Sequence, residues 1–425
     1  MQKTSNKRYH ILALVFITVV INYLDRSNIS VAAFALSDEL NLSSVQMGLI
    51  FSAFAWTYSA LQIPGGILVD YIRPRILYPI ILTLWSLATL LQGFISSLWG
   101  FIGSRAAIGV FEAPSYPANN KIVSAWFPEQ ERASAIAIYT SGQFIGLAFL
   151  TPVLVLIQSY LGWRGLFIVS GLIGILWALV WYLAYRDPQR HPKVSQAELD
   201  YIAEGGAIIE KPKAQAPKAK LTGRDLALAF GNRKLWGVYI GQFCLGSLFV
   251  FFLTWFPTYL VKYRGLDFIQ SGFLASLPFV AAFVGVLLSG FISDAMVRRG
   301  FSDEKARKGP ILMGMLLSMS IIGANYTEST FWIIFFLSVA FLGNGLASIT
   351  WVFVSLLAPK ELIGLIGGVF NFIGGLSGAL TPIIIGYLVE EGNFAPALFY
   401  IAALAFLGLC SYLFLIGKVE RITRH

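Results

Sequence analysis

The sequence predicts an all-α membrane protein with twelve transmembrane helices, arranged as two six-helix bundles related by a pseudo-two-fold axis along the membrane normal. Three observations predict this fold: an apolar composition, twelve apolar spans, and a motif that occurs once in each half. Of the 425 residues, 57% are hydrophobic and only 12% are charged, whereas about 25% of the residues of an average soluble domain are charged. The chain is therefore not a soluble protein.

Twelve stretches are long and apolar enough to cross a bilayer as helices, which takes about 20 residues each. The first span is too long for a cleavable signal peptide and carries Asp25 and Arg26, so we interpret it as a true transmembrane span. A polar segment separates six spans from six and defines three predicted parts: an N-terminal bundle (1–185), a linker loop (186–233) and a C-terminal bundle (234–425). The spans cover residues 9–35, 46–69, 76–97, 99–122, 133–157, 164–185, 234–261, 268–297, 309–324, 331–357, 362–389 and 394–417.

The net charge of +9 is distributed in a way that indicates orientation. Most of the lysines and arginines lie in alternate loops and in the two terminal tails, and only Arg164, Lys262 and Arg264 fall in loops on the opposite side. Because positive residues favour the cytoplasmic side of a membrane, both termini are expected in the cytoplasm. The basic charge therefore predicts no nucleic-acid partner.

Cys244 and Cys410 lie inside spans and the three histidines are scattered, so no metal or cofactor site is expected.

The linker and its neighbours carry local structure signals. Ser195 and Glu198 fit a capping box that opens a short helix, and Thr222 is a candidate cap for a second one.

A motif occurs on both sides of the linker: Gly65-Gly-Ile-Leu-Val-Asp70 closes the second span, and Ser289-Gly-Phe-Ile-Ser-Asp294 closes the eighth. Two similar halves in the same orientation predict parallel repeats with a ligand site between them near the midplane.

Four charged residues lie deep within spans of the first half: Asp25 and Arg26 on the first span, Arg105 and Glu112 on the fourth. Such charges cost at least several kcal/mol unless they face a polar interior or each other. Arg105 and Glu112 share one helical stripe about 10 Å apart, and Pro114 loosens the helix just beyond them. For each acid, a permanently ionised structural pair is the alternative to a role in transport.

Two acids beside two guanidinium groups favour the coupling of protons to an anion. A guanidinium fork matches a carboxylate, so Arg26 is a good anchor for an acidic solute. Burial favours the protonated form of a carboxylic acid, and a nearby arginine favours the ionised form. If the solute competes with Asp25 or Glu112 for an arginine, protonation of that acid stabilises the loaded state. This linkage yields symport.

Uncharged polar residues cluster on four further spans, two in each half. Amides and hydroxyls beside an aromatic ring suit a polyhydroxylated ligand, although each of them alone could equally join one helix to another. The candidate residues are Tyr58, Gln143, Ser348, Thr350, Trp351 and Asn371.

The repeated motif resembles the signature of the major facilitator superfamily. Its first copy continues to Arg75, and its second is followed by Arg298. Tyr71 stands where the family usually has a basic residue, and Arg73 where it usually has glycine. The resemblance implies that such turns tie the halves together and gate their movement on the cytoplasmic side. The residues it assigns to this gating are Asp70, Arg75, Asp294 and Arg298.

Within that superfamily, the chain is similar to the anion:cation symporter family, above all to its bacterial sugar-acid branch. The stretches that carry the likeness include Asn22-Tyr-Leu-Asp25-Arg26, Phe111-Glu112-Ala-Pro and Phe370-Asn371-Phe. The resemblance implies a proton-coupled importer of a sugar-acid anion such as D-galactonate, working by alternating access as a monomer in the bacterial inner membrane. The proton is the coupling ion and no cofactor is implied.

The same resemblance implies roles for single residues. Asp25 and Glu112 carry the proton coupling, Arg26 binds the substrate carboxylate, and Arg105 supports the acids as part of an ion pair. The six uncharged candidates named above line the sugar-acid site.

Other functions remain open from the sequence. A hexuronate, an aldarate or another organic anion could be the substrate, and sodium could replace the proton. A drug/proton antiporter is disfavoured because the fifth span lacks the usual glycine-proline bend, having Gly146 followed by Leu147. A membrane enzyme or a non-transporting sensor is disfavoured because no catalytic motif appears and all four central charges are present.

Overall fold

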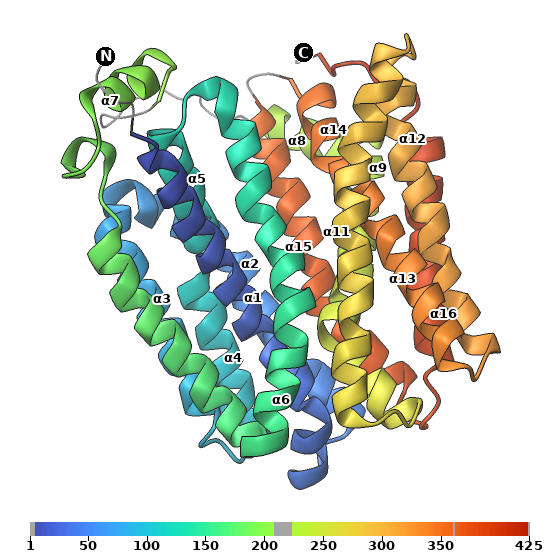
Figure 1. Ribbon diagram of the computed structural model, residues 1–425. Coiled ribbons are helices and arrows are strands. Elements are labelled where there is room, and N and C mark those ends of the chain that lie inside the picture. Colours follow the sequence, from blue (N-terminus) through green and yellow to red (C-terminus); the bar gives the residue numbers. More distant parts are fainter. Residues whose placement is uncertain (1–4, 208–222, 360–361, 424–425) are drawn as a thin grey trace.

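The computed structural model describes residues 5–207, 223–359 and 362–423, apart from the side chains of Asp70, Ala133, Asp294, Val297 and Asp303. Throughout these ranges the chain forms helices and loops without a strand, and the long helices stand side by side in two groups (Figure 1). The first group consists of α1 (Lys7–Glu39), α2 (Ser44–Tyr71), α3 (Pro74–Gln92), α4 (Leu98–Glu112), α5 (Ser115–Trp126) and α6 (Glu129–Ala184).

The second group contains shorter and more interrupted helices. Several of them continue directly into a 3-10 or π turn, so that one rod is built from two or three pieces. They are α9 (Arg233–Thr254), α10 (Phe256–Thr258), η2 (Tyr259–Tyr263), α11 (Phe268–Arg298), α12 (Asp303–Ser318), η3 (Met319–Tyr326), α13 (Thr330–Leu346), η4 (Ala347–Thr350), α14 (Trp351–Leu357), α15 (Ile363–Leu388), α16 (Ala395–Cys410) and η6 (Ser411–Leu415).

Nine helical segments among the described residues are long and apolar enough to cross a membrane. One is α6, whose 56 residues would measure about 84 Å as a single rod, far more than a bilayer core of about 30 Å. Gly162 divides it, with a φ of 68° that glycine adopts readily and other residues rarely do. The two arms run in opposite directions (Figure 1). The predicted all-helical membrane fold is confirmed, while the count of twelve spans stays a prediction.

Local sequence signals explain where the helices begin and end. The Ser43 hydroxyl accepts a hydrogen bond from the Gln46 amide at 3.2 Å, and the Gln46 side chain accepts one from the Ser43 amide at 2.9 Å, so a capping box opens α2. The predicted weakness at Pro114 is also present, because α4 ends at Glu112 and α5 begins at Ser115.

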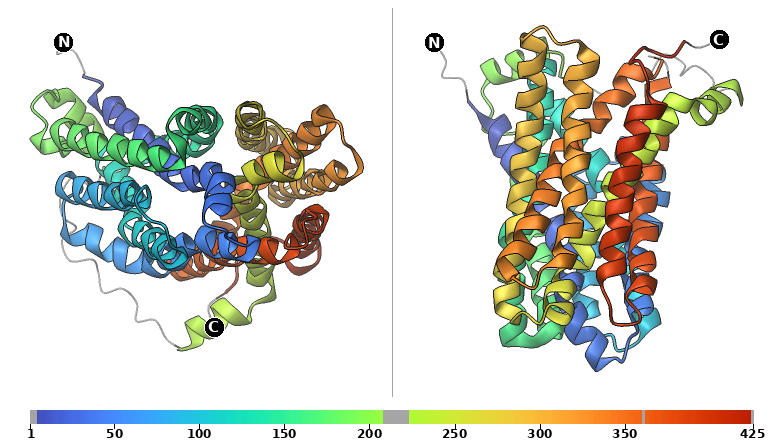
Figure 2. Two further views of the ribbon diagram at one scale, coloured as in Figure 1. Left: turned by 90° about the horizontal axis from the view of Figure 1, so that it is seen from below. Right: turned by 90° about the vertical axis from the view of Figure 1, so that its right-hand side faces the viewer.

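Two pairs of long helices make the broadest contacts between the groups, since α2 packs on α15 and α6 packs on α11, while α1 also contacts α9 and α10. Both ends of the chain lie at one end of the molecule, here called the terminal end, and the opposite end is the far end (Figures 1 and 2). Near the far end α2 and α15 approach closely. A Cβ on Gly48 would lie 2.5 Å from the Pro382 carbonyl oxygen, and one on Gly386 would lie 2.6 Å from that of Ser44.

The buried apolar residues form two clusters of unequal extent. The larger cluster includes the first group and the far part of the second, and aromatic contacts cross between the groups within it, such as Phe51–Trp255 at 5.3 Å and Phe144–Phe249 at 6.0 Å between ring centroids. The smaller cluster contains only residues of α8 (Gly223–Gly231), the second group and the C-terminal tail. The two groups thus share a core toward the far end and have separate cores toward the terminal end.

The linker adds η1 (Pro188–Arg190), α7 (Gln196–Glu204) and α8 (Gly223–Gly231). As predicted, Ser195 caps α7 by accepting from the Glu198 amide at 3.3 Å. The Glu198 carboxylate does not complete this box. It accepts instead from the amides of Lys7 and Arg8, both at 3.0 Å, and so caps the first turn of α1. The second predicted cap, Thr222, lies outside the described residues.

Candidate functional site

The ion pair between Arg26 and Glu112 is the centre of the charge network. Arg26 on α1 donates from Nε at 2.8 Å and from Nη2 at 2.5 Å to the same oxygen, Oε1 of Glu112 on α4. The Glu112 side chain is fully buried and that of Arg26 is 10% exposed. The second carboxylate oxygen of Glu112 is buried without a hydrogen-bond partner in the described part of the chain. The pair therefore leaves one oxygen of the acid available for a proton.

Aromatic rings surround the Arg26 guanidinium group. Its Cζ lies 4.9 Å from the ring centroid of Tyr23, 4.8 Å from that of Phe54 and 4.7 Å from that of Tyr58. The packing of α2 on α4 brings Phe54 and Tyr58 to this place, since Gly109 lies against the α2 backbone where any side chain would collide. Rings at this distance stabilise a cation without neutralising it, so the guanidinium group remains able to bind an anion.

Asp25 is fully buried and lies on a different side of α1 from Arg26. Its Oδ2 accepts from Nε1 of Trp85 on α3 at 3.0 Å, and the same oxygen lies 3.9 Å from the position that a Cβ would take at Gly174 of α6. Asp25 thus faces α3 and α6 inside the first group, whereas Arg26 faces α2 and α4.

Arg105 lies between the two acids without pairing with either. Its Nη1 donates to the main-chain carbonyl of Asp25 at 3.3 Å, and its Cζ lies 5.3 Å from the centroid of Phe54. Among the described residues, no carboxylate oxygen comes within 4.0 Å of its guanidinium nitrogens, and the ion pair of this site is Arg26–Glu112. Arg105 therefore contacts Asp25 through the main-chain carbonyl and not through the carboxylate. Its predicted role in supporting the acids stays a prediction.

The uncharged candidates of the first group lie close to this network. Tyr58 stacks on Phe54 with 5.1 Å between centroids. Gln143 on α6 accepts from the hydroxyl of Tyr23 at 2.8 Å, and the Tyr23 ring lies against Phe249 of α9 at 6.2 Å. Tyr23 thereby connects Arg26, Gln143 and the second group.

Of the candidates of the second group, Thr350 is the one that forms a hydrogen bond with Gln242 of α9 among the described residues. Thr350 in η4 donates to the Gln242 Oε1 at 3.0 Å, and the Gln242 side chain lies 2.9 Å from the position of a Cβ on Gly374 of α15. Trp351 packs edge-on against Phe370 at 5.1 Å and keeps 45% of its surface exposed. Ser348 and Asn371 are also exposed.

The two sets of candidates approach one another where α2 crosses α15. The Ser59 hydroxyl lies where a Cβ on Gly375 would be, one residue from Tyr58 and one turn from Asn371. In the described residues, no hydrogen bond, ion pair or ring contact joins the charged network directly to Ser348, Thr350, Trp351 or Asn371. The structure thus brings the charged residues together and leaves the second group's candidates as a separate cluster beside them.

The four residues predicted to gate the halves give a different result. The side chains of Asp70 and Asp294 lie outside the described residues. Arg75 is placed within the first group, with its Cζ 5.3 Å from the ring centroid of Tyr182 on α6. Arg298 is the last residue of α11 and is exposed. Their gating role stays a prediction.

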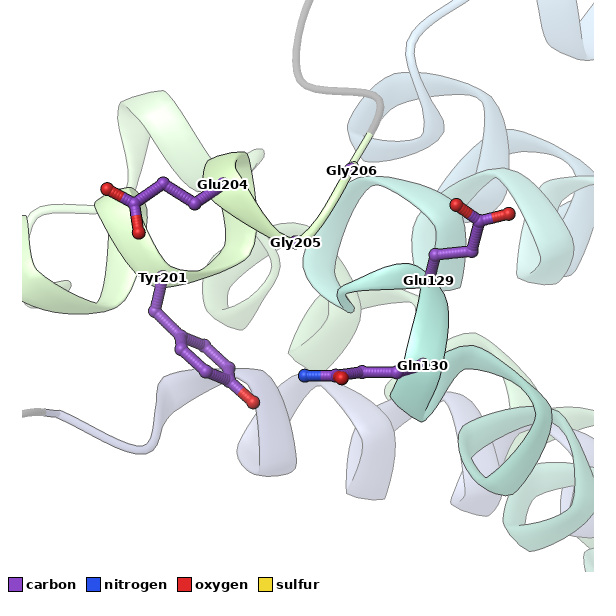
Figure 3. A pocket seen from close by; sticks show the side chains of 6 residues that line it. All are labelled: Glu129, Gln130, Tyr201, Glu204, Gly205 and Gly206. Atoms are coloured by element: carbon purple, nitrogen blue, oxygen red, sulfur yellow. The ribbon is translucent and has the colours of Figure 1, made fainter.

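A surface pocket of about 680 Å³ lies away from this network, between α7 and the start of α6, lined by Glu129, Gln130, Tyr201, Glu204, Gly205 and Gly206 (Figure 3). The carboxylates of Glu129 and Glu204 point to opposite sides of it (Figure 3), so they do not converge on one ligand. Tyr201 donates to Glu131 at 2.6 Å, and this carboxylate raises the pKa of Tyr201. The pocket belongs to the attachment of α7 and not to the charged site.

Three residues of the site were not singled out from the sequence: Tyr23, Trp85 and Gln242. Each is the hydrogen-bond partner of a predicted residue, namely Gln143, Asp25 and Thr350. Tyr23 had a signal, since it adjoins the charged pair. Trp85 and Gln242 had none, because a lone tryptophan or glutamine in an apolar span is equally well explained by packing between helices.

Comparison with known proteins now decides the family. A family model described as the Major Facilitator Superfamily matches residues 15–382. The chain belongs to this superfamily. It is 51% identical over 422 residues to the D-galactonate transporter of Escherichia coli O6:H1, covering 99% of this chain and 98% of that one. It is 41% identical to a probable galactarate/D-glucarate transporter of Escherichia coli K12, covering 99% and 96%.

Solved structures share the fold of this superfamily member. A bacterial homologue of the human lysosomal transporter Spinster, in an inward-facing and occupied conformation, superposes with a TM-score of 0.72 at 19% identity and covers 97% of this chain and 96% of that one. The nucleoside transporter NupG superposes with a TM-score of 0.73 at 12% identity, covering 96% and 100%. The predicted major-facilitator fold is confirmed.

Proposed function

We propose that the protein is a proton-coupled symporter that imports a sugar-acid anion such as D-galactonate by alternating access. The observation that carries the proposal is the buried pair of Arg26 and Glu112, in which Nε and Nη2 of the arginine both donate to Oε1 of the glutamate. The names of the relatives support the substrate class, since the 51%-identical one is a D-galactonate transporter and a 41%-identical one a probable galactarate/D-glucarate transporter.

The mechanism follows from charge balance around Arg26. A substrate carboxylate that takes the guanidinium fork displaces the carboxylate of Glu112, which then lies buried without its cation. An unpaired charge in such a place is strongly unfavourable, so Glu112 takes up a proton as the substrate binds. Loss of the substrate restores the Arg26–Glu112 pair and releases the proton. Anion and proton therefore bind and leave together.

Asp25 provides the second proton-binding group of the proposed cycle. It has no ion-pair partner within the described residues, and its Oδ1 is buried without a hydrogen-bond partner there. Its hydrogen bond from Trp85 holds the carboxyl group in place in either protonation state. The exposed ring of Trp351 and the polar groups of Ser348, Asn371, Tyr58 and Gln143 suit the hydroxylated carbon chain of the substrate.

The proposed orientation places both termini in the cytoplasm of a bacterium and the far end outside its inner membrane. The shared aromatic core then closes the outer side, and the separate cores lie on the cytoplasmic side, as in an inward-facing state. We further propose that one chain is sufficient for transport, because the charged network lies wholly within it.

Transport by reconstituted protein tests the proposal. Liposomes containing the purified protein are given labelled galactonate, glucuronate or glucarate, with an inward proton gradient, an inward sodium gradient or none. The expected result is accumulation of galactonate driven by the proton gradient and abolished in Asp25→Asn. Accumulation driven only by the sodium gradient contradicts the proposal that the proton is the coupling ion. Transport of glucuronate or glucarate without galactonate contradicts the proposed substrate.

A further inference from the structure

A row of buried polar side chains extends along α3 from the level of Asp25 toward the far end. Ser86, Thr89 and Gln92 are all 0% exposed, although each carries a hydrogen-bonding group. Apolar residues would serve better if this face of α3 only packed against its neighbours. Gln92 is the last residue of α3, directly before the loop at the far end.

Two more buried polar residues flank this row on the neighbouring helices. Asn28 lies one turn from Asp25 on α1, and Ser170 lies one turn from Gly174 on α6; both are 0% exposed. The helices α3 and α6 pack closely here, because Gly171 contacts Ser86 and Leu90. The polar residues therefore come from three helices that meet inside the first group.

The row is continuous with Asp25. Oδ2 of Asp25 and the hydroxyl of Ser86 both lie within 4 Å of the position that a Cβ would take at Gly174. The hydroxyl of Thr89 lies near the carboxyl group of Asp25 without reaching hydrogen-bond geometry. At the other end, the carbonyl of Gly93 accepts from Arg164 at 3.4 Å.

Arg164 marks where the row reaches the surface. Its Nη2 pairs with Glu39 at 2.7 Å, and these side chains are 38% and 49% exposed. The row thus extends from the buried carboxyl group of Asp25 to Gly93, which accepts a hydrogen bond from the partly exposed Arg164 at the far end.

Side-chain polar atoms of this row, and of Asp25, Asn28 and Ser170 beside it, lack hydrogen-bond partners within the described protein. Native structures satisfy almost all buried polar groups, and bound water does so where protein groups do not. One such atom would say little, but here they are neighbours on three helices. The unpartnered atoms are Oδ1 of Asp25, Nδ2 and Oδ1 of Asn28, Oγ of Ser86, Oγ1 of Thr89, Nε2 and Oε1 of Gln92, and Oγ of Ser170.

We propose that this row holds a file of water molecules that carries protons between the far face and Asp25, along a route separate from that of the substrate. The inference rests on the proposed proton symport and deepens it. A proton that enters the file from solvent is matched by protonation of the Asp25 carboxylate at its inner end. The groups that face Asp25 are Trp85 from α3 and Arg105 from α4, with Glu112 beyond.

The separation of routes follows from the placement of two adjacent residues. Asp25 contacts α3 and α6, while Arg26 contacts α2 and α4, where the proposed substrate anchor lies. A proton on the file reaches Asp25 without passing the guanidinium group of Arg26, whose positive charge would repel it.

The test compares proton-driven uptake with substrate exchange in liposomes. Thr89→Val and Gln92→Leu remove polar groups from the row. Thr151→Val is the matched control, because this threonine is 3% exposed and its hydroxyl donates to the Leu147 carbonyl of its own helix at 2.6 Å. The row variants are expected to slow uptake driven by a proton gradient severalfold. Exchange of labelled for unlabelled galactonate at equal pH needs no net proton movement, so the row variants are expected to exchange at the wild-type rate. The control variant is expected to keep the wild-type rates of both uptake and exchange.

Two results overturn the inference and leave the proposed symport intact. One is proton-driven uptake at the wild-type rate in both row variants, with the wild type itself accelerated by the gradient; the symport then stands and the file fails. The other is an experimental density map that resolves buried water elsewhere and shows none along the row. If the gradient does not accelerate the wild type, the proposed symport fails, and the proton-carrying role of the file fails with it.

Discussion

Glu112 pairs with Arg26 on a neighbouring helix, and not with Arg105, which shares its own helix and its own stripe. A separation of two helical turns is too long for a salt bridge, whereas α1 brings Arg26 directly opposite. The acid therefore connects α4 to α1. Any ligand that competes for Arg26 acts on the contact between these two helices.

Replacing Glu112 by glutamine imitates its protonated form. The amide keeps an oxygen that can accept from Arg26, so the fold and the binding of galactonate are expected to persist, measured as a galactonate-induced rise in melting temperature. Proton uptake on binding, measured with a pH-sensitive dye in weak buffer, is expected to decrease relative to the wild type. Glu39→Gln, at the exposed ion pair with Arg164, is the control and should leave both readouts unchanged. Complete loss of binding in folded protein would favour a purely structural pair.

Replacing Arg26 by lysine keeps the charge and removes the fork. At least one charge-assisted hydrogen bond is lost, which weakens galactonate binding by about 1.5–3 kcal/mol, or roughly ten- to a hundredfold. Isothermal titration of the purified variant measures this change. Unchanged affinity would show that the substrate carboxylate is held elsewhere.

Gly48 controls how closely α2 approaches α15 near the far end. In Gly48→Val the new Cβ would lie 2.5 Å from the Pro382 carbonyl oxygen, so the far end is expected to open. Gly103→Val is the control, because no atom of the described residues outside its own helix lies within 4 Å of that Cβ position.

The opening is measured as a distance across the far end. Spin labels on cysteines introduced at the exposed positions Asp38 and Glu390, with Cys244 and Cys410 replaced by serine, report it by pulsed electron paramagnetic resonance. The distribution should shift to longer distances in Gly48→Val and remain unchanged in the control. Identical distributions in both variants would contradict the role assigned to this contact.

Glu198 attaches the linker to α1. Glu198→Ala removes the acceptor for the amides of Lys7 and Arg8 and is expected to lower stability by about 1–3 kcal/mol. Glu198→Gln keeps an acceptor and should lose less. Thermal unfolding of both variants measures the difference, and equal losses would mean that charge, not capping, holds α7 in place.

The sequence predicted those features that one helix or one rule of chemistry determines. Charges inside apolar spans are costly, so Asp25, Arg26, Arg105 and Glu112 could be identified without a structure. The break near Pro114 and the cap at Ser195 follow from local backbone chemistry.

Pairings between helices could not be predicted in the same way. Which arginine Glu112 meets depends on how α1 and α4 are rotated about their axes, and every apolar residue on both helices contributes to that rotation. The capping of α1 by Glu198 has the same origin, since the two residues are joined only by tertiary packing. The residue pattern favoured a box within α7, and the neighbouring helix end competed for the same carboxylate.

The charged network belongs to one group of helices, while Ser348, Thr350, Trp351 and Asn371 belong to the other. If these four residues select the sugar acid together with Tyr58 and Gln143, mutation and selection at the four can alter substrate preference on one side of the molecule and leave energy conversion on the other side intact. Divergence into carriers for different acids then requires few simultaneous changes. Engineering of new specificities should begin with libraries at these four positions, with α1 and α4 held constant.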